Sequence, residues 1–360
     1  MNTTKKFEYN IEFFDREKEK QEILNILKVK PQLINFIYGP INSGKTTLIQ
    51  KLIDDLPKDK YAVFYINLRG KLIKEYGGFV RVLFKVKRKE ISEKLTEKGE
   101  KLAKKTLVLA GRYLSGIPIE KDMLDGFLDA ESTEDVFEFL EEYFLKISET
   151  KIPILIIDEL QVIGDLEING KAIYKLFNFF IRLTKELHIC HVFTLSSDSL
   201  FIENVYNEAM LEGRANYILV DDFDEETTSK FLEKYNISEK EQELVKKYFG
   251  GKPIYLADVI NTKFTGKDIK KAIEKTLKIR KGQIEEIIYT LKDEDKEMFK
   301  GCTSVLEKLK DKDNFDYLNV TKYVRFLVGK NIIFVNCAEK NIKAQSRINL
   351  IAIREILKEI

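Results

Sequence analysis

The sequence of 360 residues contains few of the residue types on which several protein classes depend. Its three cysteines, Cys190, Cys302 and Cys337, are an odd number and lie far apart, outside any C-x-x-C spacing. This pattern argues against a disulfide framework and against a zinc site. With only 2 histidines, a histidine-based hydrolytic triad is poorly supplied. The 18 glycines and 6 prolines make up less than a tenth of the chain, which excludes collagen-like and low-complexity proteins.

Both histidines belong to one short segment, His188-Ile189-Cys190-His191, whose composition is similar to that of a metal site. We expect this segment to lie in a strand, where residues 188 and 190 point to one face of the sheet and residue 191 to the other. The nearby sequence offers no fourth ligand. We therefore interpret these residues as structural.

The chain also lacks a dominant charge and a long hydrophobic run. It has 61 Lys and Arg against 59 Asp and Glu, a net charge of +2, so no global field attracts it to nucleic acid or to a membrane. No stretch approaches the ~18 apolar residues of a membrane-spanning helix, and the N-terminus has no apolar signal region. We expect a soluble, cytoplasmic protein without a membrane partner.

Charge is nevertheless segregated locally. Residues 81–112 carry eleven Lys and Arg against four Glu, and residues 120–142 carry ten Asp and Glu against one Lys. Two interpretations remain open. Either the two segments are solvated helical faces that match each other in charge, or they contact a partner or a neighbouring subunit.

Hydrophobic residues, 44% of the chain, follow the periods of alternating helices and strands. Residues 15–30 have the pattern of an amphipathic helix. Buried strands are expected at 33–38 and 61–68, separated by a helix that stops before Pro57. A strand, a helix and a strand in this order form a βαβ unit, which requires a parallel sheet. The sequence therefore predicts an α/β fold with a parallel sheet flanked by helices.

The rest of the chain predicts a continuation of this core and two further units. The expected elements are a helical segment 79–149, strands 152–157 and 189–195 around a helix 170–187, helices 224–235, 238–249, 252–262 and 266–280, three helical stretches from about 284, strands at 332–335 and near Ile342, and a helix from Leu350. Helices followed by a β-hairpin have the outline of a winged helix. We therefore divide the chain into a core of residues 1–220 with an insertion at about 79–149, a helical lid of residues 221–282 and a winged-helix domain of residues 283–360.

The segment after the first predicted strand has the pattern GxxxxGK[ST]. Its residues, with the threonine that follows, are Gly39, Pro40, Ile41, Asn42, Ser43, Gly44, Lys45, Thr46 and Thr47. Glycine lets the backbone curl so that consecutive N–H groups point inward at the start of a helix, where they bind phosphate. The lysine of this pattern reaches the β- and γ-phosphates, and the hydroxyl of Thr46 ligates Mg²⁺. A chance match has a probability on the order of 1%, so we predict a P-loop.

An acidic pair stands after a later predicted strand. Four apolar residues, 154–157, precede Asp158 and Glu159. At the carboxyl end of a buried strand, Asp158 is placed to hold the metal through water, and Glu159 to orient and polarise the attacking water. The motif is weak alone, because many strands end in this way, but together with a P-loop it predicts a nucleoside triphosphate site. The pair also argues against kinases and GTPases, which position the nucleophile with other motifs.

Together these motifs resemble those of the archaeal ATPase family, a branch of the AAA-plus/STAND group of P-loop NTPases. The resemblance extends over residues 10–355, is least specific at 79–149, and includes six further segments. They are Phe13-Phe14-Asp15-Arg16-Glu17-Lys18-Glu19, Asp158-Glu159-Leu160-Gln161, Leu195-Ser196-Ser197, Gly213-Arg214, Gly250-Gly251-Lys252-Pro253 and Ala344-Gln345-Ser346-Arg347. The resemblance implies an adenine nucleotide, and no guanine-reading N-K-x-D motif stands out.

The resemblance implies that three of these residues lie at the base of the nucleotide. The backbone around Asp15 and Arg16 would contact adenine, and Pro253 of the lid would pack near the base. Structural alternatives remain open for two of them. Arg16 could pair with a glutamate of its own helix, and Pro253 could only form a turn.

The resemblance implies other residues at the phosphates. Ser196 or Ser197 would sense the γ-phosphate, although Leu195 replaces the glycine that usually precedes them. Arg214 would be an arginine finger, because a guanidinium compensates phosphate charge in the transition state. It could act within its own chain or on a neighbour. Alternatively the serines satisfy a strand end, Arg214 lies on the surface and Gln161 only starts a helix.

The sequence thus predicts Mg²⁺-dependent ATP binding and hydrolysis that moves the winged-helix domain. Two alternatives remain open: a DNA-binding initiator- or transposition-type ATPase, and a signalling scaffold that binds ATP and seldom turns over. DNA or protein contact would involve cations of the C-terminal domain. They are Lys322, Arg325, Lys330, Lys340, Lys343 and Arg347. Assembly into a homo-oligomer also remains open.

Overall fold

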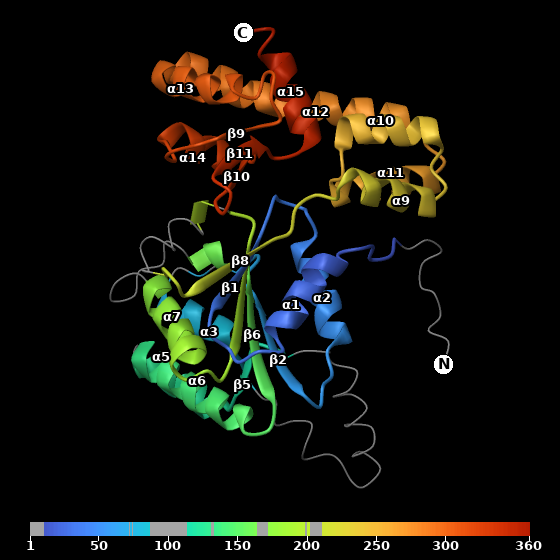
Figure 1. Ribbon diagram of the computed structural model, residues 1–360. Helices are drawn as coiled ribbons and strands as arrows, with labels where there is room; N and C mark the ends of the chain where they lie inside the picture. The colour runs from blue at the N-terminus through green and yellow to red at the C-terminus, as the bar shows by residue number, and fades with distance from the viewer. Residues whose placement is uncertain are drawn as a thin grey trace.

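The computed structural model describes residues 11–71, 73, 75–86, 114–130, 133–163, 172–198, 200–201 and 211–360. Most of the basic segment 81–112 lies outside these ranges. In Figure 1 a twisted sheet stands between two groups of helices, and the lid helices and the C-terminal elements lie beyond one edge of the sheet. Within the described ranges, no helix is long and apolar enough to span a membrane.

The central sheet brings the carboxyl ends of several strands together at one edge. Among the described strands its order is β4-β2-β6-β7-β1-β8, and the pairings are parallel. The bounds are β1 (Ile34–Tyr38), β2 (Tyr61–Asn67), β4 (Leu114–Ser115), β6 (Ile152–Asp158), β7 (His191–Ser196) and β8 (Ala215–Leu219). The predicted parallel sheet is confirmed. Because β6, β7 and β1 are adjacent and parallel, the segments that follow them meet at the same edge of the sheet. Open α/β sheets bind ligands at this edge.

Helices cover both faces of the sheet (Figure 1). One face packs against α1 (Glu17–Ile26) and α2 (Lys45–Asp55), and the other against α3 (Tyr76–Leu83), α5 (Lys121–Ala130), α6 (Thr133–Ser148) and α7 (Ala172–Ile181), which continues into a π-helical turn, η3 (Arg182–Glu186). The strands alternate accordingly. In β2, Tyr65 belongs to the apolar cluster with α1 and α2, whereas Phe64 belongs to the cluster on the opposite face. The predicted helices around β1 are confirmed, and α2 ends before Pro57 as expected.

The expectation of a wholly helical segment at 79–149 is wrong in part. Helix α3 ends at Leu83, and the next residues form β3 (Phe84–Val86), which pairs in parallel with β5 (Ile117–Ile119). The short strand β4 joins the central sheet beside β2. Strands of two or three residues are too short to show a period of two, so hydrophobic periodicity could not reveal them. Helices α5 and α6 confirm the helical prediction over their own lengths, whereas residues 87–113 lie outside the described ranges.

The lid is tied to the C-terminal region by one long helix. Helices α9 (Glu225–Lys234), α10 (Glu239–Phe249) and α11 (Pro253–Phe264) confirm the first three predicted lid helices. The break expected between 280 and 284 is wrong, because α12 runs without interruption over Ile269–Glu294, 26 residues. Its Ile273 packs in the lid cluster and its Ile288 in the C-terminal cluster. A single glycine inside such a helix costs only about 1 kcal/mol, so Gly282 does not end it.

The C-terminal region combines helices with a small antiparallel sheet. Its elements are α13 (Lys296–Glu307), β9 (Asn314–Asp316), α14 (Lys322–Gly329), β10 (Ile333–Asn336), β11 (Asn341–Ala344) and α15 (Arg347–Ile356). The strands pair in the order β10-β11-β9. The predicted hairpin is confirmed. The last helix begins at Arg347 rather than Leu350, because the side chain of Ser346 caps it by accepting a hydrogen bond from the backbone N–H of Asn349.

This C-terminal hairpin docks on the edge of the central sheet. The hydroxyl of Tyr38, at the end of β1, donates a buried hydrogen bond to Oδ1 of Asn336 at 2.7 Å. The side-chain oxygen of Gln345 accepts a hydrogen bond from the backbone N–H of Ile41 at 2.8 Å. Lys343 forms an ion pair with Asp221, on the segment between β8 and α9. The hairpin therefore contacts both the predicted P-loop and the connection to the lid.

Candidate functional site

A cavity of about 410 Å³ opens at the edge of the sheet where β1 ends. The residues that line it are Ile11, Glu12, Phe13, Phe14, Arg16, Ile41, Asn42, Ser43, Gly44, Lys45, Thr46, Thr47, Arg69, Glu159, Ser197, Phe223, Phe231, Pro253, Ile254 and Ala257. They come from the N-terminal segment, the predicted P-loop, the end of β6, the segment after β7 and the lid. The cavity thus gathers most of the predicted site residues.

The loop between β1 and α2 has the backbone that its glycines permit. Gly44 has a φ of 95°, and a Cβ on Gly39 would lie 2.1 Å from the carbonyl oxygen of Val220. Only glycine fits at these two positions. Asn42 also has a positive φ, 61°. The hydroxyl of Ser43 is buried and makes no hydrogen bond within the described part of the chain.

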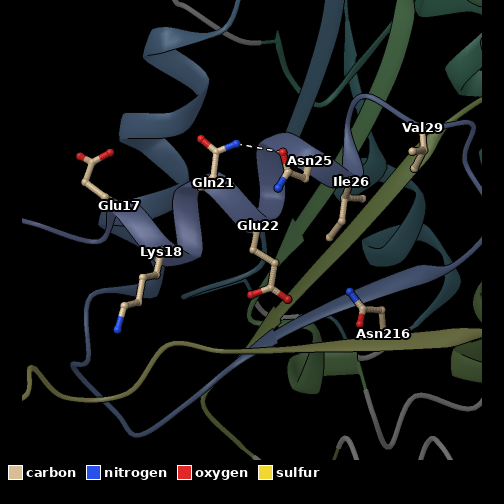
Figure 2. A pocket seen from close by; sticks show the side chains of 8 residues that line it. All are labelled: Glu17, Lys18, Gln21, Glu22, Asn25, Ile26, Val29 and Asn216. Carbon is tan, nitrogen blue, oxygen red and sulfur yellow. Dashed lines mark hydrogen bonds between the residues drawn. The ribbon is translucent and has the colours of Figure 1, made fainter.

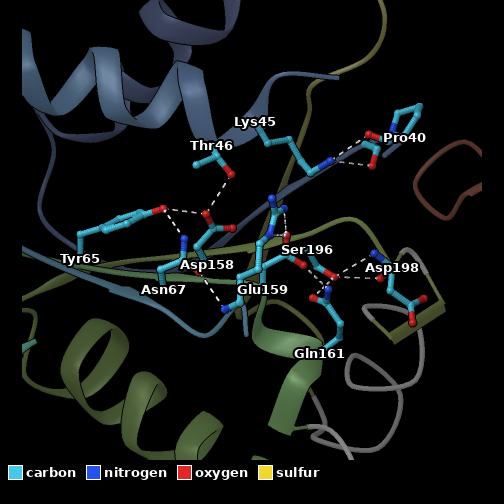
Figure 3. Close-up of polar contacts among 12 residues, drawn as sticks. Pro40, Lys45, Thr46, Tyr65, Asn67, Asp158, Glu159, Gln161, Ser196 and Asp198 are labelled. Atoms are coloured by element: carbon cyan, nitrogen blue, oxygen red, sulfur yellow. Dashed lines mark hydrogen bonds and ion pairs between the residues drawn. The ribbon is translucent and has the colours of Figure 1, made fainter. Parts of the chain in front are cut away.

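Lys45 starts α2 and is held inside this loop (Figure 3). Its Nζ donates to the carbonyl oxygens of Gly39 at 3.0 Å and Pro40 at 2.9 Å. Burial, with a contribution from the neighbouring charge of Lys252, lowers the pKa of Lys45 from 10.5 to about 8. The folded-state pKa lies below the unfolded value, so below about pH 8 the charge on Lys45 destabilises the fold when no anion is present. A buried ammonium group in this position favours an anionic ligand.

Thr46 and Asp158 meet across the cavity floor. The Thr46 hydroxyl donates to Oδ2 of Asp158 at 2.9 Å, although the two residues are 112 positions apart in sequence. The hydroxyl of Tyr65 donates to the same oxygen at 2.7 Å (Figure 3). Asp158 is 3% exposed, and its buried carboxylate is satisfied by these two donors. The donors hold the carboxylate in one orientation, in which its other oxygen can accept a hydrogen bond or bind a metal ion.

Glu159 is held by two side chains. Arg69, which follows β2, forms an ion pair with it, with Nε 3.1 Å from Oε1. Nε2 of Gln161 donates to Oε2 of Glu159 at 2.5 Å, so Gln161 does more than start a helix. Glu159 has a φ of 62°, an uncommon conformation for a residue other than glycine that recurs at functional sites. The ion pair raises the pKa of Arg69.

The two predicted sensor serines point to different places. Ser197 lines the cavity. Ser196, at the end of β7, is buried, and its hydroxyl donates to Oε1 of Gln161 at 2.9 Å (Figure 3). Gln161 therefore links Ser196 to Glu159. The geometry places Ser197 in reach of a ligand and Ser196 behind it.

Arg16 is buried and joins the N-terminal segment to the P-loop and to the segment after β8. Its guanidinium donates to Glu19 at 2.7 Å, as the structural alternative expected, but also to the carbonyl oxygens of Ser43 at 2.8 Å and Asp221 at 2.6 Å. It also lies 4.5 Å from the ring centroid of Phe223. Asp15 does not join Arg16 inside: its carboxylate accepts a hydrogen bond from the Thr227 hydroxyl on α9 at 2.9 Å.

Part of the cavity lining is apolar. Phe14, Phe223 and Phe231 pack together there, with Phe14 and Phe231 ring centroids 5.4 Å apart. Pro253 and the 45% exposed Ile254 of α11 complete this part. The lining therefore combines polar and charged groups with an apolar aromatic cluster, as a nucleotide with a phosphate tail and a flat base requires.

Lys252, next to Pro253, ties the lid to the loop. It is 2% exposed, and its Nζ lies 2.8 Å from Asp222 and donates to the carbonyl oxygen of Ile41 at 3.2 Å. Burial lowers the pKa of Lys252 and raises that of Asp222, while their mutual attraction opposes both shifts. A lid movement that separated Lys252 from Ile41 would take one acceptor away from this buried ammonium group, which is costly.

Arg214 does not reach the cavity of its own chain. It precedes β8, and its carbonyl oxygen accepts a hydrogen bond from Ile34 at the start of β1. The P-loop follows the other end of β1, roughly 15 Å away at ~3.3 Å per residue. The interpretation of Arg214 as an arginine finger within its own chain is therefore wrong, because the parallel pairing of β8 with β1 places it at the opposite edge of the sheet.

The histidine segment and a second hollow lie outside this site. The strand β7 begins at His191 rather than at residue 189, and burial lowers the pKa of His191 to about 4, so it is neutral. Nδ1 of His188 lies 2.7 Å from the carbonyl oxygen of Pro31. The second hollow runs along α1 beside β8 (Figure 2), and none of the predicted site residues lines it. Its lining residues are Glu17, Lys18, Gln21, Glu22, Asn25, Ile26, Val29 and Asn216.

The donors at the cavity floor fit Mg²⁺. Thr46 and Asp158 supply hard oxygen atoms, the ligand type that this ion prefers. Within the described ranges, no group of three or more His, Cys, Asp or Glu residues could form a closed metal cage. Mg²⁺ characteristically binds through one or two carboxylates together with substrate phosphates, so the arrangement suits an ion that arrives with a nucleotide.

Three residues of the site were missed by the sequence analysis: Arg69, Tyr65 and Lys252 in its contact with the loop. A signal existed for the first two. Tyr65, Asn67 and Arg69 alternate at the end of the strand that pairs with β6 in register, Asn67 opposite Asp158. Had the neighbouring strand been known, the period of two would have directed all three towards the acidic pair.

A parallel sheet of this order, with a P-loop after β1 and an acidic pair after β6, which β7 separates from β1, defines a P-loop ATPase domain. The comparison with family models agrees. The model of the ATPase domain predominantly from Archaea matches residues 13–259, and the model of the uncharacterized ATP-binding protein MJ1010-like C-terminal domain matches residues 270–357. The chain belongs to this archaeal ATPase family.

Relatives match over nearly the whole chain. The uncharacterized ATP-binding protein MJ1659 of Methanocaldococcus jannaschii is 49% identical over 356 residues, covering 98% of this chain and 99% of the relative. The uncharacterized ATP-binding protein PYRAB06260 of Pyrococcus abyssi is 43% identical over 348 residues, covering 96% and 99%. The boundary between the two family models, residues 260–269, lies near the start of α12.

Solved structures share the fold. The Walker-type ATPase PABY2304 of Pyrococcus abyssi superimposes with a TM-score of 0.63 at 18% identity, covering 95% of this chain and 96% of that chain. The ORC2 protein of Aeropyrum pernix, in ADPNP-ADP complexes, superimposes with a TM-score of 0.52 at 12% identity, covering 98% and 96%. At these identities the likeness shows the architecture alone.

Proposed function

We propose that this protein binds ATP with Mg²⁺ and hydrolyses it, and that the nucleotide state moves the C-terminal winged-helix domain. One observation carries the proposal: Lys45, Thr46 and Glu159 line one cavity that also has an apolar part, and the buried Asp158 accepts a hydrogen bond from the Thr46 hydroxyl. The steady-state release of phosphate from ATP tests it. We expect release in Mg²⁺ and none in EDTA. A folded protein that releases no phosphate under either condition, alone or with DNA, contradicts hydrolysis.

The residues of this chain divide the chemistry between them. Lys45 neutralises charge on the phosphates, and Thr46 and Asp158 hold the metal ion. When bound, Mg²⁺ supplies further charge neutralisation at the phosphate oxygens. Glu159 orients the attacking water and accepts its proton. The water oxygen forms a bond to the γ-phosphorus as the bond from this phosphorus to the bridging oxygen breaks, and ADP leaves. Ser197 lies where it can contact the terminal phosphate.

The contacts of Glu159 favour slow turnover in the nucleotide-free conformation. An ion pair with Arg69 and a hydrogen bond from Gln161 occupy both of its carboxylate oxygens. These contacts compete with the attacking water for the carboxylate oxygens. Arg69 has a 69% exposed side chain, so it can swing away. We propose that this release accompanies activation, and that Arg214 completes the site of a neighbouring copy.

The C-terminal coupling rests on the hairpin that contacts the P-loop. Three contacts join the two parts. The Tyr38 hydroxyl donates to Asn336, and the backbone N–H of Ile41 donates to the side-chain oxygen of Gln345. Lys343 forms an ion pair with Asp221. Nucleotide binding must reshape the loop from which Lys45 now reaches Gly39 and Pro40, because Lys45 has to leave those carbonyl oxygens. We propose that this rearrangement loosens the hairpin and frees the winged helix.

Amide hydrogen exchange tests this coupling. We expect ATP with Mg²⁺ to speed exchange in β10 and β11, and Asn336→Ala to speed it about fivefold without nucleotide, because one buried hydrogen bond contributes about 1 kcal/mol. Asn341→Ala, on the same hairpin but with a side-chain amide that donates to Glu339 of the hairpin turn, serves as the matched control. Exchange in the hairpin that does not respond to nucleotide would refute the coupling.

Contact within the chain explains three of the six C-terminal cations better than DNA does. Lys322 pairs with Glu297, Lys343 with Asp221 and Arg347 with Asp313. A cation that already binds a carboxylate has less to gain from a phosphate backbone. Affinity for duplex DNA that falls steeply with salt, and that is lost on replacing these cations, would instead support the DNA-binding alternative.

Proton uptake on ATP binding is expected at alkaline pH. The pKa of Lys45 is about 8 in the free protein, so at pH 8.5 a large share of its amines is neutral, and phosphates will raise that pKa. Binding should take up roughly 0.5–1 proton at pH 8.5 and almost none from this group at pH 7. Calorimetric titrations in two buffers of different ionisation enthalpy measure this difference. Uptake should vanish in Lys45→Arg, because arginine stays charged.

A further inference from the structure

We propose that Tyr65 is a positioning residue of the magnesium–nucleotide site, whose buried hydroxyl sets the orientation of the Asp158 carboxylate before the metal ion binds. The inference rests on the proposed function, because it concerns the same site. It assigns a role to β2, the strand next to β6. The residues of β2 belong neither to the P-loop nor to the acidic pair.

The strand β2 places Tyr65 beneath Asp158. In the parallel pairing of β2 with β6, Tyr65 lies opposite Ile156 and Asn67 opposite Asp158. Tyr65 is 3% exposed and its ring packs in the apolar cluster beneath α2, the helix that Lys45 and Thr46 begin. The side chain therefore enters the site from below, through the sheet face that supports the P-loop helix.

Two donors converge on one oxygen of the carboxylate. The hydroxyl of Tyr65 donates to Oδ2 of Asp158 at 2.7 Å, and the hydroxyl of Thr46 donates to the same atom at 2.9 Å. Thr46 has to use its oxygen lone pairs as a metal ligand, and its single proton can still point to Asp158. Tyr65 is then the second anchor, and it keeps the carboxylate plane from rotating about the Cβ–Cγ bond.

The direction of the Tyr65 hydroxyl is itself determined. Nδ2 of Asn67 donates to the Tyr65 oxygen at 3.3 Å (Figure 3). Oδ1 of Asn67 accepts a hydrogen bond from the backbone N–H of Arg69 at 2.8 Å, which fixes the amide so that its nitrogen faces the phenol. Because an incoming donor occupies the phenol oxygen, the phenol proton is directed to the carboxylate, an acceptor when ionised. The order of donation is Asn67 to Tyr65 to Asp158.

This arrangement predicts a specific energetic effect. Groups that orient metal ligands typically change metal affinity 10- to 100-fold when they are removed. Loss of the Tyr65 hydroxyl should therefore weaken nucleotide binding that depends on Mg²⁺. It should leave binding through the P-loop backbone, Lys45 and the apolar part of the cavity unchanged, because the Tyr65 hydroxyl donates to Asp158 and Tyr65 is not among the residues that line the cavity.

The test compares Tyr65→Phe with Tyr61→Phe by titrating a fluorescent ATP analogue into the full-length protein in Mg²⁺ and in EDTA. The phenylalanine keeps the ring that packs under α2. Tyr61, on the same strand and also buried, is the matched control, because its hydroxyl has only a long 3.5 Å contact with the carbonyl oxygen of Leu27. The readout is the ratio of the dissociation constants in EDTA and in Mg²⁺, which requires no turnover.

We expect Tyr65→Phe to lower this ratio about tenfold while the dissociation constant in EDTA stays within twofold of wild type. Asn67→Ala should lower it in the same direction by a smaller factor, and Tyr61→Phe should not change it. An unchanged ratio in Tyr65→Phe overturns the inference alone. An equal loss of affinity in Mg²⁺ and EDTA assigns Tyr65 a merely structural role. Wild-type protein whose nucleotide binding ignores Mg²⁺ would overturn the metal part of the proposed function as well.

Discussion

Lys45→Ala is expected to reduce the affinity for ATP about 100-fold. The lysine supplies the buried ammonium group of the cavity, and a charge-assisted hydrogen bond to phosphate contributes about 1.5–3 kcal/mol. The same substitution should not destabilise the nucleotide-free protein, because burial already disfavours the charge, as the low pKa of about 8 shows. Equilibrium binding of a fluorescent ATP analogue and thermal unfolding without nucleotide measure the two effects separately.

Lys51→Ala is the matched control for this prediction. Lys51 lies on the same helix, α2, but its side chain is 44% exposed and pairs with Asp55. Its loss should change neither ATP affinity nor, by more than ~1 kcal/mol, stability. If Lys45→Ala bound ATP as tightly as Lys51→Ala, the loop around Lys45 would not be the phosphate site. A large fall in thermal stability of Lys45→Ala alone would point to a structural role instead.

Glu159→Gln is expected to keep ATP binding within about twofold of wild type and to slow hydrolysis by roughly 10²- to 10⁴-fold, the usual contribution of a general base. The amide preserves the size of the side chain and can still bond to Gln161, but it cannot accept a proton from water. Single-turnover hydrolysis with the protein in excess separates this effect from product release.

Glu141→Gln is the matched control for this prediction, and Arg69→Ala is a second test of the role of Glu159. Glu141 also pairs with an arginine, Arg182, but on α6 and away from the cavity, so its substitution should leave hydrolysis unchanged. Arg69→Ala removes the ion pair that holds Glu159 and should raise basal hydrolysis several-fold. Full hydrolysis by Glu159→Gln would exclude Glu159 as the base. A protein whose biological output survives Glu159→Gln and is lost in Lys45→Ala would instead be an ATP-gated scaffold.

The nucleotide-binding half of the site could be predicted from the sequence because its determinants are local. The GxxxxGK[ST] pattern dictates the loop, since Gly39 has to avoid the Val220 carbonyl group and Gly44 has to adopt a positive φ. The buried strand before Asp158 is continuous and apolar, so its end could be placed within a residue. Such motifs carry their own backbone requirement, and tertiary context only has to accept it.

The remainder depends on which strands are neighbours, and the sequence does not state this. Arg214 is three-dimensionally distant from the P-loop because β8 runs parallel to β1, whereas Arg69 and Tyr65 are close because β2 lies beside β6. The union of the last lid helix and the first C-terminal helix in α12 also escaped prediction. The predicted lid ended at residue 282, but burial of apolar side chains on both sides of Gly282 outweighs the small cost of one glycine.

The choice between Ser196 and Ser197 could likewise be made only in three dimensions. Successive residues at the end of a strand point to opposite sides, and the sequence does not say which side contains the cavity. In the structure Ser197 lines the cavity, while Ser196 turns to Gln161. The contact from Ser196 through Gln161 to Glu159 shows why a glutamine at this position is more than the start of a helix.

The central claim is that Thr46 and Asp158, 112 residues apart, hold one metal ion on one nucleotide. A double-mutant cycle of Thr46→Val and Asp158→Asn, read out as calorimetric affinity for ATP in Mg²⁺ and in EDTA, tests it most directly. We predict that each single variant loses most of the Mg²⁺-dependent affinity and that the double variant loses little more. Losses that simply add, or that are equal in EDTA, would show that the two residues act at separate places and would contradict the account.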